Sequence, residues 1–176
     1  YSIMENLSGV VWSMPVFQAP HREFLEQRGI PYVVINNLQH GVKAPLIESD
    51  NLTAIRQGVE YLVGMGHREI GFVGGALEIA NMSDRYNGYL QHMKEFGLEI
   101  DRDWIIDDLA GADTESALEG TYRLIGRRRM PTALICVSES VALGVYEALR
   151  YRGFCIPDDV SVIAFDDSPL SRMMQP

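Results

Sequence analysis

Near its C-terminal end the sequence carries two short apolar segments separated by a helical pattern, and this arrangement limits the possible folds more than any other feature. Residues 133–137 and 160–165 have the length of buried strands, and residues 140–151 between them have helical spacing. A strand–helix–strand unit of this kind places its two strands in parallel. Their carboxyl ends then share one sheet edge, outside which open α/β sheets bind ligands. Ser138 and Asp166 directly follow the two strands, so we predict that both lie in a ligand site.

The same alternation of helical and strand patterns extends towards the N-terminus. From residue 50 onward helices and strands alternate four times, which predicts an α/β fold of parallel sheets flanked by helices. Residues 1–49 have a smaller set of the same kind. The strands expected in the larger part are residues 70–73, 104–106, 133–137 and 160–165, and those in the smaller part are 10–13 and 32–35. We therefore predict two lobes, residues 1–49 and 50–176, each with its own sheet.

Composition and motifs argue against several kinds of protein. The net charge of −9 disfavours direct binding of nucleic acid by this chain, because phosphate binding needs a basic face. The four histidines are scattered and predict no metal site. No serine has the context of a hydrolase nucleophile, and Gly74-Gly75 fits no phosphate-binding motif, so a tight turn is expected there. The sequence therefore indicates neither an enzyme nor a cofactor.

For two further polar positions, the local sequence pattern alone leaves alternative interpretations open. Arg85 falls near the predicted start of a helix at Asp84, where a positive charge is unfavourable for the helix dipole. An ordinary surface arginine and a ligand-binding one both remain open. Asp166 followed by Asp167 favours hydrogen bonding to a polar ligand, and a turn or helix cap is the alternative.

Six short motifs, in the same order along the chain, resemble those of the lactose-repressor/galactose-repressor (LacI/GalR) family of bacterial transcription regulators. They are Asp50-Asn51 with Gly58 and Leu62, Gly66-His67-Arg68 before Ile70, Arg85 with Gly88-Tyr89, Pro131-Thr132-Ala133, Ala142-Leu143-Gly144, and the run from Pro157 to Asp167. Each motif alone is weak, but six in the correct order are a strong indication.

The resemblance implies a two-lobed, periplasmic-binding-protein-like fold with an incomplete N-terminal lobe. It implies a small polar effector, a sugar or related metabolite, bound between the lobes without a cofactor or metal. The effector positions of the family match Arg85 and Asp166, and they fall on Ser138 where the family usually has Asn. Asn36 and Ser13 lie at strand ends of the other lobe, on the same cleft edge. A helix-turn-helix head, absent from this sequence, would bind operator DNA.

This comparison predicts the effector-binding core of a cytoplasmic, homodimeric transcription regulator. The helix after Ser138 is expected to lie partly in the dimer interface, because Val141, Leu143, Val145 and Tyr146 give it much apolar surface. The alternative is that these four side chains are intramolecular core. A different class of protein, the periplasmic sugar-binding protein of a transporter, shares the fold and is the second interpretation.

Overall fold

The computed structural model describes residues 7–13, 17–36, 43–169 and 171–174. The chain divides into two compact units. The first comprises Tyr1–Asp50 and Glu78–Asn81, and the second comprises Asn51–Leu77 and Met82–Pro176. In the described part of the chain, none of the helices has the length and apolar character needed to cross a membrane.

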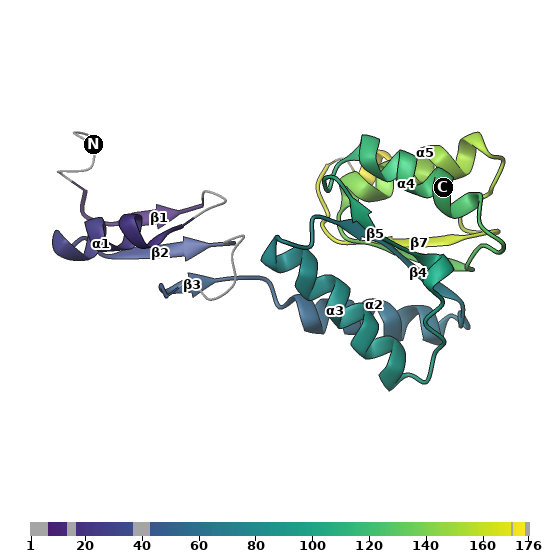
Figure 1. Ribbon diagram of the computed structural model, residues 1–176, viewed down its shortest axis with the longest axis horizontal. Helices are drawn as coiled ribbons and strands as arrows, with labels where there is room; N and C mark the ends of the chain where they lie inside the picture. Colours follow the sequence, from purple (N-terminus) through teal and green to yellow (C-terminus); the bar gives the residue numbers. More distant parts are fainter. Residues whose placement is uncertain (1–6, 14–16, 37–42, 170, 175–176) are drawn as a thin grey trace. The chain divides into compact units, whose positions relative to one another are not determined.

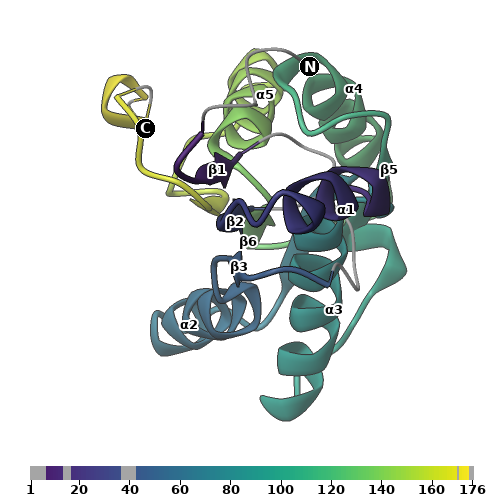
Figure 2. The ribbon, with the colours of Figure 1, turned by 90° about the vertical axis from the view of Figure 1, so that its left-hand side faces the viewer.

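In its described residues the first unit forms a small parallel sheet with a helix beside it (Figure 2). Its elements are β1 (Val10–Trp12), α1 (Ala19–Gln27), β2 (Tyr32–Ile35) and β3 (Leu46–Ile47). The strands lie in the order β1-β2-β3, and both pairs are parallel. Leu25 of α1 packs with Phe17, Ile30 and Val34 to form the buried core of this unit. The predicted separate sheet of the smaller part is therefore confirmed.

The second unit is a four-stranded parallel sheet with the strand order β5-β4-β6-β7. Its elements are α2 (Asn51–Gly64), β4 (Ile70–Gly75), α3 (Ala80–Glu95), β5 (Ile105–Leu109), α4 (Thr114–Ile125), β6 (Ala133–Cys136), α5 (Glu139–Tyr151) and β7 (Ser161–Ala164), with short 3-10 turns at Arg102–Trp104 and Ser171–Met173. The first two residues of α3, Ala80 and Asn81, are assigned to the first unit. The four strands predicted for this part are neighbours, as expected. The predicted α/β fold with two parallel sheets is confirmed.

Helices cover both faces of this sheet (Figure 1). The α2 and α3 helices lie on one face, and α4 and α5 lie on the other. Every residue of the central strands β4 and β6 is buried, which is the pattern of parallel strands covered on both sides. In α5, Val141 and Val145 are fully buried, whereas Leu143 and Tyr146 are only half-buried. Two of the four apolar residues considered for a dimer interface are therefore core of this unit.

Gly74 and Gly75 form the end of β4 instead of the expected tight turn. An added Cβ on Gly75 would lie 2.6 Å from Leu109 Cα and closer still to its backbone nitrogen and oxygen. An added Cβ on Gly74 would collide with Val137. The two glycines thus have a packing role, because any side chain would separate β4 from its neighbours.

Two element boundaries differ from the predictions by three residues or more, because polar residues obscured them. The α3 helix begins at Ala80, so residues 81–83, expected as a loop, are helical and Arg85 lies in the second turn. The β5 strand continues to Leu109, although its Asp107 and Asp108 resemble a loop. These carboxylates form two-bond ion pairs with Arg102 and Arg123 at 2.6–2.8 Å. Paired aspartates are compatible with a strand, and the pairing is not visible in local sequence.

Tyr89 provides a first test of the core. Its side chain is fully buried, its hydroxyl donates to the Ile70 carbonyl at 2.9 Å, and burial raises its pKa. We expect Tyr89→Phe to lower the free energy of unfolding by about 1–2 kcal/mol, because the carbonyl loses its buried donor. Urea denaturation measures this change. Tyr151→Phe, at a position 81% exposed, is the control and should change stability by less than about 0.5 kcal/mol; equal effects of both variants would refute the prediction.

Candidate ligand-binding site

Ser138 and Asp166 follow two neighbouring strands at the carboxyl edge of the second unit's sheet. Cys136 of β6 pairs with Ala164 of β7, and each candidate residue stands two positions beyond this pair. Ser138 is half-buried and caps α5, with its Oγ accepting from the Val141 N–H at 3.2 Å. Its hydroxyl hydrogen is not used by the cap. Asp166 is exposed and has a φ of 77°, a left-handed conformation that Asp tolerates better than most residues.

Arg85 reaches the same edge from α3, and three elements hold its guanidinium. The side chain is only 7% exposed. Its Nε–H donates to Asn51 Oδ1 of α2 at 2.8 Å, and Nη1 donates to the Val137 carbonyl after β6. The guanidinium carbon lies over the Phe165 ring, 3.9 Å from the ring centroid. The local alternative of an ordinary surface arginine does not fit this burial.

The electrostatics of the site link Arg85 to Asp166. Burial lowers the pKa of Arg85, and the nearby Asp166 carboxylate acts in the opposite direction. A guanidinium titrates so far above neutrality that it stays charged despite this lowering. Asp166 therefore provides an exposed counter-charge next to a buried cation. A carboxylate acceptor, a guanidinium donor and a serine hydroxyl together suit a ligand rich in hydroxyl groups.

The segment that carries Asp166 is anchored to the start of α5. Glu139 accepts from the Ser168 backbone N–H at 3.1 Å and also from the Ser168 hydroxyl. A hollow of about 310 Å³ lies beneath this segment, between α5 and β7, and Asp166 and Asp167 contribute to its lining. The anchor limits the positions that Asp166 can adopt at the sheet edge.

Ser13 and Asn36 lie at the carboxyl edge of the first unit's own sheet. The strands β1 and β2 pair in parallel with Trp12 opposite Val34, and both candidates follow within two residues of this pair. Both side chains are exposed. Asn36 has a φ of 49°, which Asn adopts more readily than other non-glycine residues. The structure thus brings together Ser13 and Asn36 in one unit, and Arg85, Ser138 and Asp166 in the other.

Sequence reasoning missed two residues of the Arg85 environment. In the sequence Asn51 was noted only as part of the Asp50-Asn51 motif, yet it is the first residue of α2 and its side chain is 6% exposed. Its spacing from the buried residues Ile55 and Val59 places it on the inner face of α2, and this spacing was the available signal. Phe165 is the last residue of an apolar run, and nothing in the sequence indicates that it lies beneath a guanidinium.

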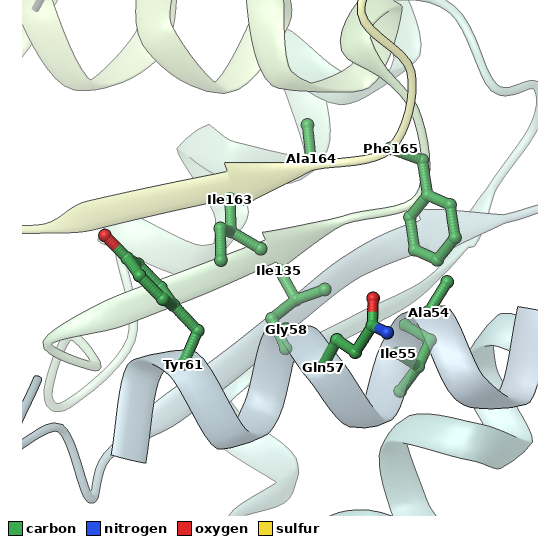
Figure 3. Close-up of a pocket in the computed structure, with 9 residues that line it drawn as sticks. All are labelled: Ala54, Ile55, Gln57, Gly58, Tyr61, Ile135, Ile163, Ala164 and Phe165. Carbon is green, nitrogen blue, oxygen red and sulfur yellow. The ribbon is translucent and has the colours of Figure 1, made fainter. Parts of the chain in front are cut away.

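An apolar hollow of about 350 Å³ lies on the other side of β7 (Figure 3). Its lining comes from α2, β6 and β7 with the adjoining Phe165, and consists of Ala54, Ile55, Gln57, Gly58, Tyr61, Ile135, Ile163, Ala164 and Phe165. None of these side chains is charged. Arg85, Ser138 and Asp166 are not part of this lining, so the candidate site lies outside this hollow.

Metal binding has no support in the described part of the chain. No group of three or more His, Cys, Asp or Glu residues there is arranged to hold a metal ion. Cys136 is buried inside β6, and burial raises the pKa of its thiol. Arg85, Ser138 and Asp166 offer hydrogen bonding and charge pairing to a ligand.

Comparison with known protein families identifies the domain type. The model of the periplasmic binding protein-like domain matches residues 59–176, which is more than half of the chain. The matched range includes Arg85, Ser138 and Asp166. It covers every strand of the four-stranded sheet.

The curated relatives are bacterial transcriptional repressors. The PurR repressor of Actinobacillus pleuropneumoniae is 28% identical over 174 residues, which are 99% of this chain and 51% of that protein. The CytR repressor of Escherichia coli K12 is 32% identical over 153 residues, which are 86% of this chain and 44% of that protein. The chain spans about half the length of the curated relatives that it matches.

Solved structures agree with this assignment. A LacI-family regulatory protein from Chloroflexus aggregans has a TM-score of 0.83 and 29% identity, over 96% of this chain and 60% of that one. The transcriptional regulator CelR, in complex with cellobiose, shares the fold with a TM-score of 0.81 and 24% identity, over 98% of this chain and 53% of that one. The chain therefore belongs to the periplasmic binding protein-like domain family, in the form found in LacI/GalR-type transcriptional regulators.

Proposed function

We propose that this chain is the effector-sensing core of a LacI/GalR-type transcription regulator of the bacterial cytoplasm. Residues 1–49 and 50–176 would belong to its N-terminal and C-terminal lobes. The core binds a small hydroxyl-rich effector, a sugar or related metabolite, between the lobes. It acts as a homodimer that contacts operator DNA through a separate head, and its role is binding and not catalysis.

The observation that carries this proposal is the group formed by Arg85, Ser138 and Asp166 at one sheet edge of a domain whose relatives are repressors. Ser13 and Asn36 occupy the corresponding strand ends of the first unit. A ligand that contacts both lobes shifts their equilibrium only through a difference in its affinity for the two arrangements. Polar groups on both lobes provide the means for such a difference.

The transporter interpretation has less support. A periplasmic sugar-binding protein shares the fold, but the curated relatives described above are repressors, and their alignments cover 86–99% of this chain.

The homodimer proposal rests on the half-buried Leu143 and Tyr146 of α5, since Val141 and Val145 are buried in the core. Sedimentation of the intact protein measures its assembly, and a monomer would rule the homodimer out.

A thermal-shift screen of the intact protein tests the effector class. The panel contains sugars, nucleosides and purine bases, with cellobiose, ribose, adenosine and guanine among them. A compound that binds only the folded protein, at a free concentration of 100 times its Kd, stabilises the protein by about 2.7 kcal/mol. We expect a hydroxyl-bearing compound to raise the melting temperature. If none does, the proposed effector class is wrong.

Asp166→Asn tests the site within this proposal. The exposed carboxylate supports little of the fold, so stability should change by less than about 0.5 kcal/mol. Binding of the panel compound should weaken by about 1.5–3 kcal/mol, because a charged hydrogen-bond acceptor is lost. Calorimetry on the intact protein measures this change. Asp158→Asn, at an exposed position outside the site, is the control; equal affinities of wild type and Asp166→Asn would exclude Asp166 from the site.

A further inference from the structure

Asn51 stands where the chain enters the second unit. It is the first residue of α2 and directly follows Asp50, at which the contiguous part of the first unit ends. Burying a carboxamide is costly unless its polar atoms are paired. The Asn51 side chain is 6% exposed, and its oxygen accepts from Arg85 Nε–H at 2.8 Å. The bond to Arg85 accounts for the burial of this amide oxygen.

The backbone around this bond is fixed by close helix packing. Gly88 lies less than one turn beyond Arg85 on α3, facing the first turns of α2. An added Cβ on Gly88 would lie 3.3 Å from Leu52 Cδ2 and 3.4 Å from Ile55 Cβ. The two helices therefore approach closely at this point. The position of Asn51 relative to Arg85 is set by backbone packing as well as by side-chain rotation.

The remaining contacts of the guanidinium do not fix its orientation by themselves. The Phe165 ring lies beneath it, and an aromatic face permits in-plane movement of a stacked cation. The Val137 carbonyl accepts only from Nη1, so the side chain can swing about this hydrogen bond by changing its own torsion angles. The second hydrogen bond, from Nε–H to Asn51, opposes this movement. It therefore restricts the direction in which the other N–H groups point.

We propose that Asn51 is a positioning residue of the effector site, acting through Arg85. Its amide oxygen fixes the guanidinium orientation in which Arg85 donates to a hydroxyl-bearing effector. The inference rests on the proposed function, because it requires Arg85 to contact the effector. Because Asn51 is the first residue of the second unit, the proposal also links the orientation of Arg85 to the point at which the chain enters this unit.

The first experiment needs no effector. In the intact protein labelled with ¹⁵N-arginine, the Arg85 Nε–H signal is assigned by its disappearance in Arg85→Lys. We expect Asn51→Leu to accelerate hydrogen exchange of this proton at least about tenfold, because its acceptor is removed. Asn51→Asp keeps an acceptor oxygen and should preserve slow exchange. Asn87→Leu, the same change at an exposed position of α3, is the matched control; unchanged exchange in Asn51→Leu would overturn the proposal.

The second experiment measures affinity by calorimetry, using the compound among cellobiose, ribose, adenosine and guanine that stabilises the wild-type protein. Asn51→Leu should weaken binding about 10- to 100-fold, and Asn51→Asp should recover most of the loss. A lower melting temperature of Asn51→Leu with unchanged affinity would show a purely structural role and overturn the proposal. If Asn51→Leu does not fold, Asn51→Ser, whose hydroxyl is too short to reach Arg85, is judged by the same criteria.

The two proposals can fail separately. If none of the hydroxyl-bearing compounds cellobiose, ribose and adenosine binds the wild-type protein, the proposed effector class is wrong. The exchange experiment then decides alone whether Asn51 orients Arg85: accelerated exchange in Asn51→Leu with recovery in Asn51→Asp supports it, and unchanged exchange overturns it.

Discussion

Replacement of Arg85 by alanine is expected to impair both ligand binding and folding. The substitution leaves the buried Asn51 amide oxygen without its donor, takes one donor from the Val137 carbonyl and removes the cation over Phe165. An unpaired buried group costs about 1–3 kcal/mol, and the cavity adds to this cost. We expect the free energy of unfolding to fall by about 2–4 kcal/mol. Affinity for the stabilising panel compound should fall by about 2–5 kcal/mol, as for other buried charged hydrogen bonds.

Arg123→Ala is the control for the loss of stability. Arg123 also forms two hydrogen bonds, to Asp108 at 2.7 Å, but both side chains are about half exposed. Exposed ion pairs contribute about 0.2–1 kcal/mol, so this variant should remain close to wild type in urea denaturation and in calorimetry. If Arg85→Ala were no less stable than Arg123→Ala, the supporting role assigned to the guanidinium would be incorrect.

Gly144→Ala is expected to destabilise the second unit by about 3 kcal/mol, although alanine normally favours a helix. Gly144 of α5 lies against the start of α4. An added Cβ would lie 2.8 Å from both Ala117 Cβ and Leu118 N, and closer still to the Thr114 carbonyl oxygen. These are mainly backbone atoms, so relief requires the two helices to separate. Urea denaturation of wild type and variant gives the change in free energy.

Gly64→Ala separates this packing effect from helix propensity. Gly64 is the last residue of α2, and an added Cβ there would have no atom within 4 Å. Alanine is better than glycine in a helix by about 0.5–1 kcal/mol, so this variant should be as stable as wild type or slightly more stable. A Gly144→Ala variant that gained stability in the same way would show that α4 and α5 do not pack as closely as the structure indicates.

The division into two parallel sheets was predictable because apolar strands and helical spacing alternate along the chain. All strands of the two sheets except β3 follow from this pattern, and the resemblance of six motifs reinforced it. The errors lie where a residue's role depends on a partner distant in sequence. Asp107 and Asp108 looked like a loop because their arginines are 5 and 15 residues away. Gly74-Gly75 looked like a turn because the residues that they approach, Val137 and Leu109, lie 63 and 34 residues further along the chain.

The candidate site was predictable to a similar extent. The rule that ligands bind at the carboxyl edge of a parallel sheet selected Ser138 and Asp166 as candidates, and the family resemblance added Arg85. Neither source gives the support of Arg85, because Asn51 precedes it by 34 residues and Val137 follows it by 52. Contacts of this kind can be found only in the three-dimensional structure. In the sequence, Asn51 is explained equally well as a helix start and Val137 as a strand end.

The burial of Arg85 has a consequence for redesigning the proposed effector site. Arg85 contacts residues of α2 and of the segments that follow β6 and β7, so it contributes to folding. Substitutions of Arg85 would therefore reduce the amount of folded protein before they produced a new specificity. Asp166 and Ser138 are more accessible to solvent than Arg85, and their side chains make fewer contacts that support the fold. A library for a sensor of a new metabolite should therefore keep Arg85 and Asn51 constant and vary the accessible strand-end positions around them.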